Sequence, residues 1–171
     1  MTVYRPELHA TAERGILEGP AGIYRTGGPD DRVWHMFYQY RPTPDAPSRW
    51  GHEISEDDSF NWLECDDVIA PVGGETAVRA GSVAPAGEGV DLYFTSATAA
   101  GNTIQVAHVP HVDELCADLD EDTDLDVSAA ASRLGAVVED VAGVSNFRSP
   151  CVVPDWDADA DRDDAHDGWL M

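Results

Sequence analysis

Lysine is absent from the sequence. All 10 basic residues are arginines, and the sequence contains 33 aspartates and glutamates, which gives a formal net charge of −23. Such a surface repels the phosphates of nucleic acids and of anionic membranes, so neither is expected as a partner. Salt screens the self-repulsion of an acidic chain. We therefore expect a halophilic or salt-tolerant source, although a GC-rich genome alone also explains the missing lysine.

Long apolar runs are absent, and cysteine is scarce. No run is long enough to span a membrane, and the start, from Met1 to Arg5, lacks the apolar core of a signal peptide, so we expect a cytoplasmic protein. Cys65, Cys116 and Cys151 are odd in number and widely spaced, which is typical of neither a disulfide framework nor a zinc site. We expect buried thiols. The six histidines show no metal-ligand spacing, and no metal ion or cofactor is expected.

Segments of strand length, separated by turn residues, make up most of the chain. An aromatic run at residues 33–41, closed by Pro42, predicts a buried strand, and further strands are predicted at 21–26, 50–55 and 60–65. A second set is predicted at 77–84, 90–96, 102–109 and, as a candidate, 135–140. Residues 111–126 are expected to form an acidic loop, and residues 127–134 one or two helical turns.

Four antiparallel strands in succession form one blade of a β-propeller. The length of 171 residues fits a single domain with a core of its own. We therefore expect an all-β fold, a partial β-propeller of about two blades. Blade one is expected at about 20–66, blade two at about 76–140, and the start of a third at 147–171.

Four motifs in the first third of the chain carry a resemblance to a known family. In chain order they are Arg5-Pro6-Glu7-Leu8-His9, Glu18-Gly19-Pro20-Ala21-Gly22, Phe37-Tyr38-Gln39-Tyr40-Arg41-Pro42 and Trp50-Gly51-His52. This order resembles the start of glycoside hydrolase family 32, the invertases and other β-fructosidases. The resemblance covers nearly the whole chain, but it implies only about the first two blades of a five-bladed propeller.

The resemblance also implies which carboxylates should perform the chemistry. A retaining glycosidase needs two carboxyl groups about 5 Å apart. The family's nucleophile position is Gly19 here, and the aspartate that stabilises the transition state is replaced by Ser149, in Arg148-Ser149-Pro150. The acid/base of the family lies past the end of this chain, and we interpret Glu64-Cys65 as a coincidental match. The resemblance thus predicts an impaired or inactive site.

Glu18 stands one residue before the nucleophile position. Because adjacent side chains of a strand face opposite ways, Glu18 can substitute only if a β-bulge re-aims it. The positions that match the family's sugar pocket are Gln39, Trp50, Ser82 and Arg148. Core packing and hydrogen bonding between blades are the structural alternatives for these residues.

The function expected is that of a β-fructosidase-like or sucrose-hydrolase-like domain whose activity is impaired or lost. Any remnant activity would cleave a fructosyl bond in a sucrose-like substrate. The alternatives are a non-enzymatic module that binds a sugar or a partner, and a fragment of a split hydrolase. Two blades leave sheet faces open, so self-association or a complementing chain is also expected. Seven apolar residues are expected to pack between blades: Val33, Met36, Phe37, Tyr38, Leu92, Tyr93 and Phe94.

Overall fold

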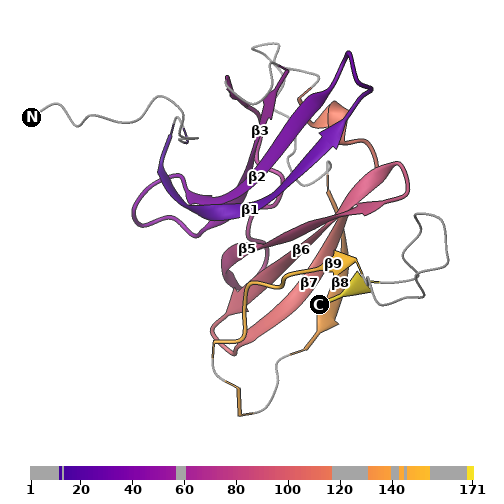
Figure 1. The fold of residues 1–171 in the computed structure, drawn as a ribbon. Helices are drawn as coiled ribbons and strands as arrows, with labels where there is room; N and C mark the ends of the chain where they lie inside the picture. The colour runs from indigo at the N-terminus through magenta and orange to yellow at the C-terminus, as the bar shows by residue number, and fades with distance from the viewer. Residues whose placement is uncertain are drawn as a thin grey trace, which may run out of the picture.

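The computed structural model describes residues 12, 14–56, 61–116, 131–139, 143–144, 146–154 and 169–171. Within these ranges the chain forms ten β-strands and one short 3-10 helix, arranged as two four-stranded sheets and one two-stranded sheet (Figure 1). The all-β prediction is confirmed. In the same ranges, no helix has the length and apolar character needed to cross a bilayer.

The first sheet contains the aromatic run at its centre. Its antiparallel order is β1 (Ile16–Thr26), β2 (Val33–Arg41), β3 (Arg49–Ser55) and β4 (Leu63–Glu64). Gly27 has a φ of +73° in the turn between β1 and β2, a conformation that favours glycine. The three prolines between β2 and β3 leave that connection without regular structure, as expected. The last strand is shorter than predicted, and residues 57–60 lie outside the described part of the chain.

The second sheet consists of β5 (Glu75–Ala86), β6 (Gly89–Thr98), β7 (Asn102–Val109) and β8 (Ser132–Val138), again in chain order and antiparallel. The prediction of a helical turn through residues 132–134 is wrong, because these residues pair with β7 in β8. Residues 127–130 of that prediction lie outside the described residues. Within the expected acidic loop, Val112–Cys116 forms the 3-10 helix η1.

A third, two-stranded sheet pairs β9 (Val153–Pro154) with β10 (Trp169–Leu170). The backbone N–H of Val152 donates to Ser82 Oγ at 2.9 Å, so this segment lies beside β5. The three sheets thus follow one another along the chain.

The core lies where the two larger sheets meet (Figure 1). Trp50 is fully buried and meets Phe94 edge-on, with ring centroids 6.5 Å apart. A Cβ at Gly22 would lie 2.7 Å from Val83 Cγ2, so glycine permits the close approach of β1 to β5. Four of the seven residues expected between blades are buried: Phe37, Tyr38, Leu92 and Phe94. The other three are half-buried: Val33, Met36 and Tyr93.

One arginine spans the second sheet from its last strand to its first. Arg133 on β8 donates to both carboxylate oxygens of Glu75 on β5, at 2.8 and 3.1 Å, and to the carbonyl of Ala70 at 2.7 Å. Its guanidinium lies 5.0 Å from the ring centroid of Phe94, and Ser96 Oγ donates to Glu75 at 2.5 Å. Burial opposes ionisation of Glu75, but these hydrogen bonds outweigh it and lower the pKa of the carboxyl group. This contact holds β8, which pairs with β7, to the first strand of the same sheet.

Candidate functional site

A β-bulge lies at Glu18. In the β1–β2 ladder Leu17 pairs with Tyr40 and Gly19 pairs with Gln39, so Glu18 is an extra residue without a partner opposite it. A bulge re-aims a side chain. The carboxylate of Glu18 accepts a hydrogen bond from the side-chain amide of Gln39. The irregularity that a substitute nucleophile would require is therefore present.

The Glu18 carboxylate is held by two hydrogen-bond donors and by one ion pair. Besides Gln39, Ser48 Oγ donates to Oε2 at 2.5 Å, and Arg41 Nε lies 2.7 Å from Oε1. The side chain is 24% exposed. Partial burial raises the pKa, but the hydrogen bonds from Ser48 and Gln39 and the charge of Arg41 outweigh it, so the pKa of Glu18 is lowered. The carboxylate of Glu18 is therefore ionised and paired with the guanidinium of Arg41.

Gly19 and Ser149, the two positions that the family resemblance predicts to be substituted, differ in their surroundings. A Cβ at Gly19 would meet no atom within 4 Å, so the space for a side chain is there and is not filled. Ser149 has a φ of +59°, a left-handed conformation that is uncommon for residues other than glycine, asparagine and aspartate. Its backbone N–H donates to the buried hydroxyl of Thr95 at 2.8 Å. Neither position carries a charge.

Gln39 and Trp50 both bond to the backbone of the second sheet. Gln39 Oε1 accepts from the N–H of Ala80 at 2.6 Å, while its amide nitrogen binds Glu18. Trp50 is fully buried, and its indole N–H donates to the carbonyl of Arg79 at 3.0 Å. Both side chains therefore use their polar groups to fasten the first sheet to the second.

These contacts converge on the segment Arg79–Ser82 of β5, which we call the β5 junction. The β5–β6 register shifts there, and Ser82 Oγ accepts the N–H of Val152. A Cβ at Gly81 would lie 2.0 Å from the carbonyl oxygen of Tyr93, so glycine is required at this point. Three of the four residues predicted to contact sugar thus contact the junction or belong to it. The fourth, Arg148, is exposed, next to Ser149.

Glu18 does not share its site with two other acidic residues of this region, Asp67 and Glu64. Asp67 accepts from Tyr40, and adjacent strand residues face opposite ways, so Asp67 lies on the other face of the sheet from Glu18 and Gln39. Glu64 lies on β4, three strands from β1, which corresponds to about 14 Å at ordinary strand spacing. A retaining pair requires about 5 Å. The interpretation of Glu64-Cys65 as a chance match agrees with this distance.

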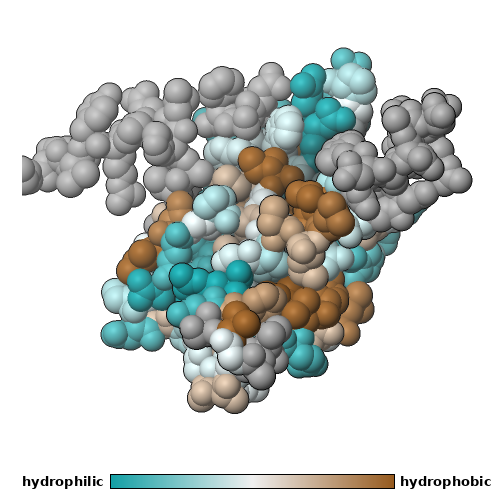
Figure 2. Space-filling model, turned by 60° about the horizontal axis from the view of Figure 1, so that its bottom comes forward, coloured by the Kyte–Doolittle hydropathy of each residue, from teal (hydrophilic) through white to brown (hydrophobic). Residues whose placement is uncertain are grey.

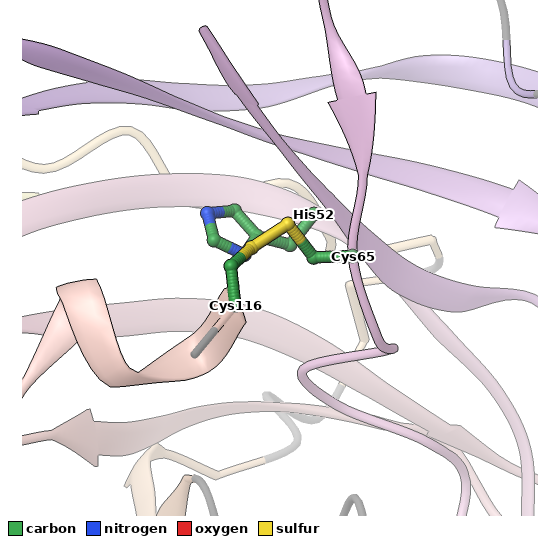
Figure 3. A group of neighbouring side chains, drawn as sticks. All are labelled: His52, Cys65 and Cys116. Atoms are coloured by element: carbon green, nitrogen blue, oxygen red, sulfur yellow. A yellow bond between two sulfur atoms is a disulfide. The ribbon is translucent and has the colours of Figure 1, made fainter. Parts of the chain in front are cut away.

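The cysteines behave differently from the expectation of buried thiols. Cys65 and Cys116 form a disulfide across a sequence separation of 51, with Cα atoms 5.5 Å apart, and Cys151 is exposed (Figure 3). His52 lies against them, with Nδ1 3.7 Å from Cys116 Sγ. Sequence reasoning missed this cluster because its members come from β3, from the residue after β4 and from η1. Their spacing contains no signal that could have revealed it.

From the imidazole of His52, a chain of hydrogen bonds runs through buried His35 to the surface at Asp113. His52 Nε2 lies 3.0 Å from His35 Nδ1, and His35 Nε2 lies 3.0 Å from Thr26 Oγ1 and 3.3 Å from Asp113 Oδ1. Burial, together with the nearby His35, lowers the pKa of His52 to about 3. Burial also lowers the pKa of His35, although the charge of Asp113 acts in the opposite direction. Both rings are therefore neutral near pH 7.

Comparisons with known proteins agree with this architecture. A fructofuranosidase variant from Schwanniomyces occidentalis, solved in complex with fructosylnystose, superposes with a TM-score of 0.63 at 23% identity, and the match covers 87% of this chain and 29% of that one. The β-fructofuranosidase of the same organism in complex with fructosyl-erythritol gives a TM-score of 0.61, also at 23% identity. The chain therefore spans 29% of the length of these neighbours. No curated protein matches significantly.

The likeness to these structures confirms the fold expected, a part of a β-propeller of this type. The family described as "Glycosyl hydrolases family 32 N-terminal domain" matches residues 9–159. This match covers most of the 171 residues. The chain accordingly belongs to glycosyl hydrolase family 32, as part of its N-terminal domain.

Proposed function

We propose that this chain is a family 32 domain that is catalytically impaired or inactive, with a fructosyl sugar as the ligand class of its ancestral pocket. The observation that carries this proposal is Gly19. Its position corresponds to the nucleophile, its surroundings would accept a side chain, and it has none. A carbon–hydrogen bond cannot attack an anomeric carbon, so the double displacement of a retaining glycosidase has no first step here.

The state of Glu18 supports the same proposal. A bulge brings its carboxylate to the side of Gln39, but Arg41, Gln39 and Ser48 all bind it. A nucleophile must approach the sugar carbon directly, and each of these partners would have to be released first. The pairing with Arg41 also makes the carboxylate a weaker nucleophile, because it stabilises the negative charge in the ground state.

The arrangement of Gln39 and Trp50 supports weak recognition of sugar rather than tight binding. Their polar groups already bond to Glu18 and to the β5 junction, so a sugar hydroxyl would have to displace a protein partner. The fructosyl ligands of the two fructofuranosidase structures belong to those proteins. They motivate the choice of fructose and sucrose as probes for this chain.

Fructose release from sucrose, inulin and levan tests the proposal. We expect no release above a buffer control from the unaltered protein, from Glu18→Gln or from Gly19→Asp, with an active invertase as positive control. Gly19→Asp is included because the open space at Gly19 accepts a side chain. Release that disappears in Glu18→Gln would contradict the proposal, since it would show that the bulge has made Glu18 the nucleophile.

A second candidate function is that of one part of a complemented hydrolase. The small β9–β10 sheet and the residue after it carry exposed apolar side chains: Val153 at 40%, Trp169 at 37%, Leu170 at 52% and Met171 at 58%. On the side that Figure 2 brings forward, apolar residues form patches among polar neighbours. A further strand or blade from a complementing chain would cover these residues.

A further inference from the structure

A histidine and two cysteines meet in the first sheet, away from Glu18 and Gly19. His52 belongs to β3, Cys65 follows β4, and Cys116 ends η1, and one ligand atom from each lies within 4.8 Å of the other two (Figure 3). Imidazole nitrogen and thiolate sulfur are the ligands that zinc prefers. We propose that reduction of the Cys65–Cys116 disulfide converts this cluster into a binding site for a thiophilic divalent metal ion, of which Zn²⁺ is the natural representative.

The distance between His52 and Cys116 already suits a metal site. In tetrahedral coordination, with Zn–S of about 2.3 Å and Zn–N of about 2.0 Å, a sulfur and a nitrogen ligand lie about 3.5 Å apart. The observed separation of His52 Nδ1 and Cys116 Sγ is 3.7 Å. The two sulfurs also have to separate, to about 3.8 Å. Cys116 ends the short helix η1, and a movement of that helix around His52 Nδ1 would separate them.

The hydrogen-bond chain behind His52 selects the tautomer that a metal requires. Asp113 accepts from Thr26, and a carboxylate can only accept, so His35 must donate through Nε2. Neutral His35 then accepts at Nδ1, which makes Nε2 of His52 the donor in that contact. The remaining nitrogen of His52, Nδ1, keeps its lone pair and points it at the sulfurs. Metal-binding histidines are usually oriented by such a partner on the other ring nitrogen.

The charge balance favours a divalent ion over two free thiolates. Two electrons and two protons from a dithiol convert the disulfide to two thiols, and the dithiol itself becomes a disulfide. Binding of M²⁺ then releases two protons and gives a neutral unit of one metal ion, two thiolates and a neutral imidazole. Two buried thiolates without a counter-charge would be costly. The three protein ligands leave one position of a tetrahedral ion for water.

Cobalt is the probe that tests this site, because tetrahedral Co²⁺ bound to thiolate absorbs visibly. The whole protein is reduced with a phosphine, freed of it without oxygen, and titrated with Co²⁺. We expect visible bands and a thiolate charge-transfer band that saturate at a single equivalent and disappear when Zn²⁺ is added. The unreduced protein should show neither. Cys65→Ser and Cys116→Ser should lose the charge-transfer band, whereas Cys151→Ser, at the exposed free cysteine, should keep it.

Asp113→Asn separates a metal site from a merely structural disulfide. This variant keeps both thiols and weakens only the far end of the hydrogen-bond chain, so cobalt affinity should fall about 10-fold or more. His108→Gln, which alters a histidine paired with Asp91 on the second sheet, is the matched control and should bind as the unaltered protein does. Circular dichroism before reduction checks that each variant folds. Absence of the charge-transfer band in the reduced protein, or equal titrations of Cys65→Ser and Cys151→Ser, would overturn the proposal.

Discussion

Replacing Arg133 by methionine tests how the second sheet is held together. The Glu75 side chain is 7% exposed and that of Arg133 is 23% exposed, so the variant leaves a buried carboxylate without its counter-charge. Breaking a buried ion pair from one side costs about 3–5 kcal/mol. Because Arg133 keeps some contact with water, we expect a loss near the lower end, about 3 kcal/mol in the free energy of unfolding.

Urea unfolding at pH 7, followed by tryptophan fluorescence, measures this loss. Glu75→Gln and the double variant complete a cycle, in which the double variant should be about 2 kcal/mol more stable than the sum of the single losses predicts. Arg25→Met, at an exposed arginine on β1, is the control and should change stability by less than about 0.5 kcal/mol. A loss below about 1 kcal/mol for Arg133→Met, or additive losses in the cycle, would refute the role assigned to this contact.

The remaining predictions concern pH, the disulfide, salt and assembly. The pKa of His52 is about 3 when folded, against about 6.5 when unfolded, so the unfolded state binds the proton first and stability should fall as pH falls below 6.5. Between pH 7 and pH 5, His52 alone should lower the free energy of unfolding by about 2 kcal/mol. A denaturation midpoint that does not change over that range would contradict the burial of its ring. The double variant Cys65→Ala/Cys116→Ala, measured without metal, should lose about 4 kcal/mol in the free energy of unfolding, because the disulfide closes a loop with a sequence separation of 51. Chemical denaturation measures this loss, and an unchanged midpoint would show that the bridge does not form in solution. The melting temperature should rise from low to molar potassium chloride because salt screens the charge of −23, and a constant value would remove the basis for a halophilic source. In molar salt, light scattering should detect self-association through the apolar β9–β10 sheet, which Leu170→Asp should abolish, whereas a monodisperse unaltered protein would show that this surface needs no cover.

The sequence was most informative where one local pattern decided the structure. The aromatic run of β2 and the alternation of Val90, Leu92 and Phe94 in β6 each predicted a strand, and the buried side chains follow that period. The turn signals around Gly27 and the prolines before β3 marked where strands end. These features are determined by residues that are close together in the sequence, so the sequence alone can predict them.

Features made by distant residues could not be predicted in the same way. The helical turn predicted for residues 127–134 rested on local cap signals, whereas the partners of Arg133, Glu75 and Ala70, lie far away in the sequence. The bulge at Glu18 is a matter of register between two strands, which the composition of either strand does not determine. The pairing of Cys65 with Cys116 depends on η1, and no capping or periodicity signal predicted that helix.

The ion pair between Glu18 and Arg41 would also affect a carboxylate introduced at Gly19. An aspartate at Gly19 would place a second carboxylate next to Glu18. The single guanidinium of Arg41 already pairs with the carboxylate of Glu18. Two such carboxylates repel, and one of them resists ionisation. Loss of Glu18 beforehand would instead leave Arg41 and the amide of Gln39 without their partner. Each of these single changes should give a less stable protein. Selection for stability alone would therefore keep Glu18, Gly19 and Arg41 as they are.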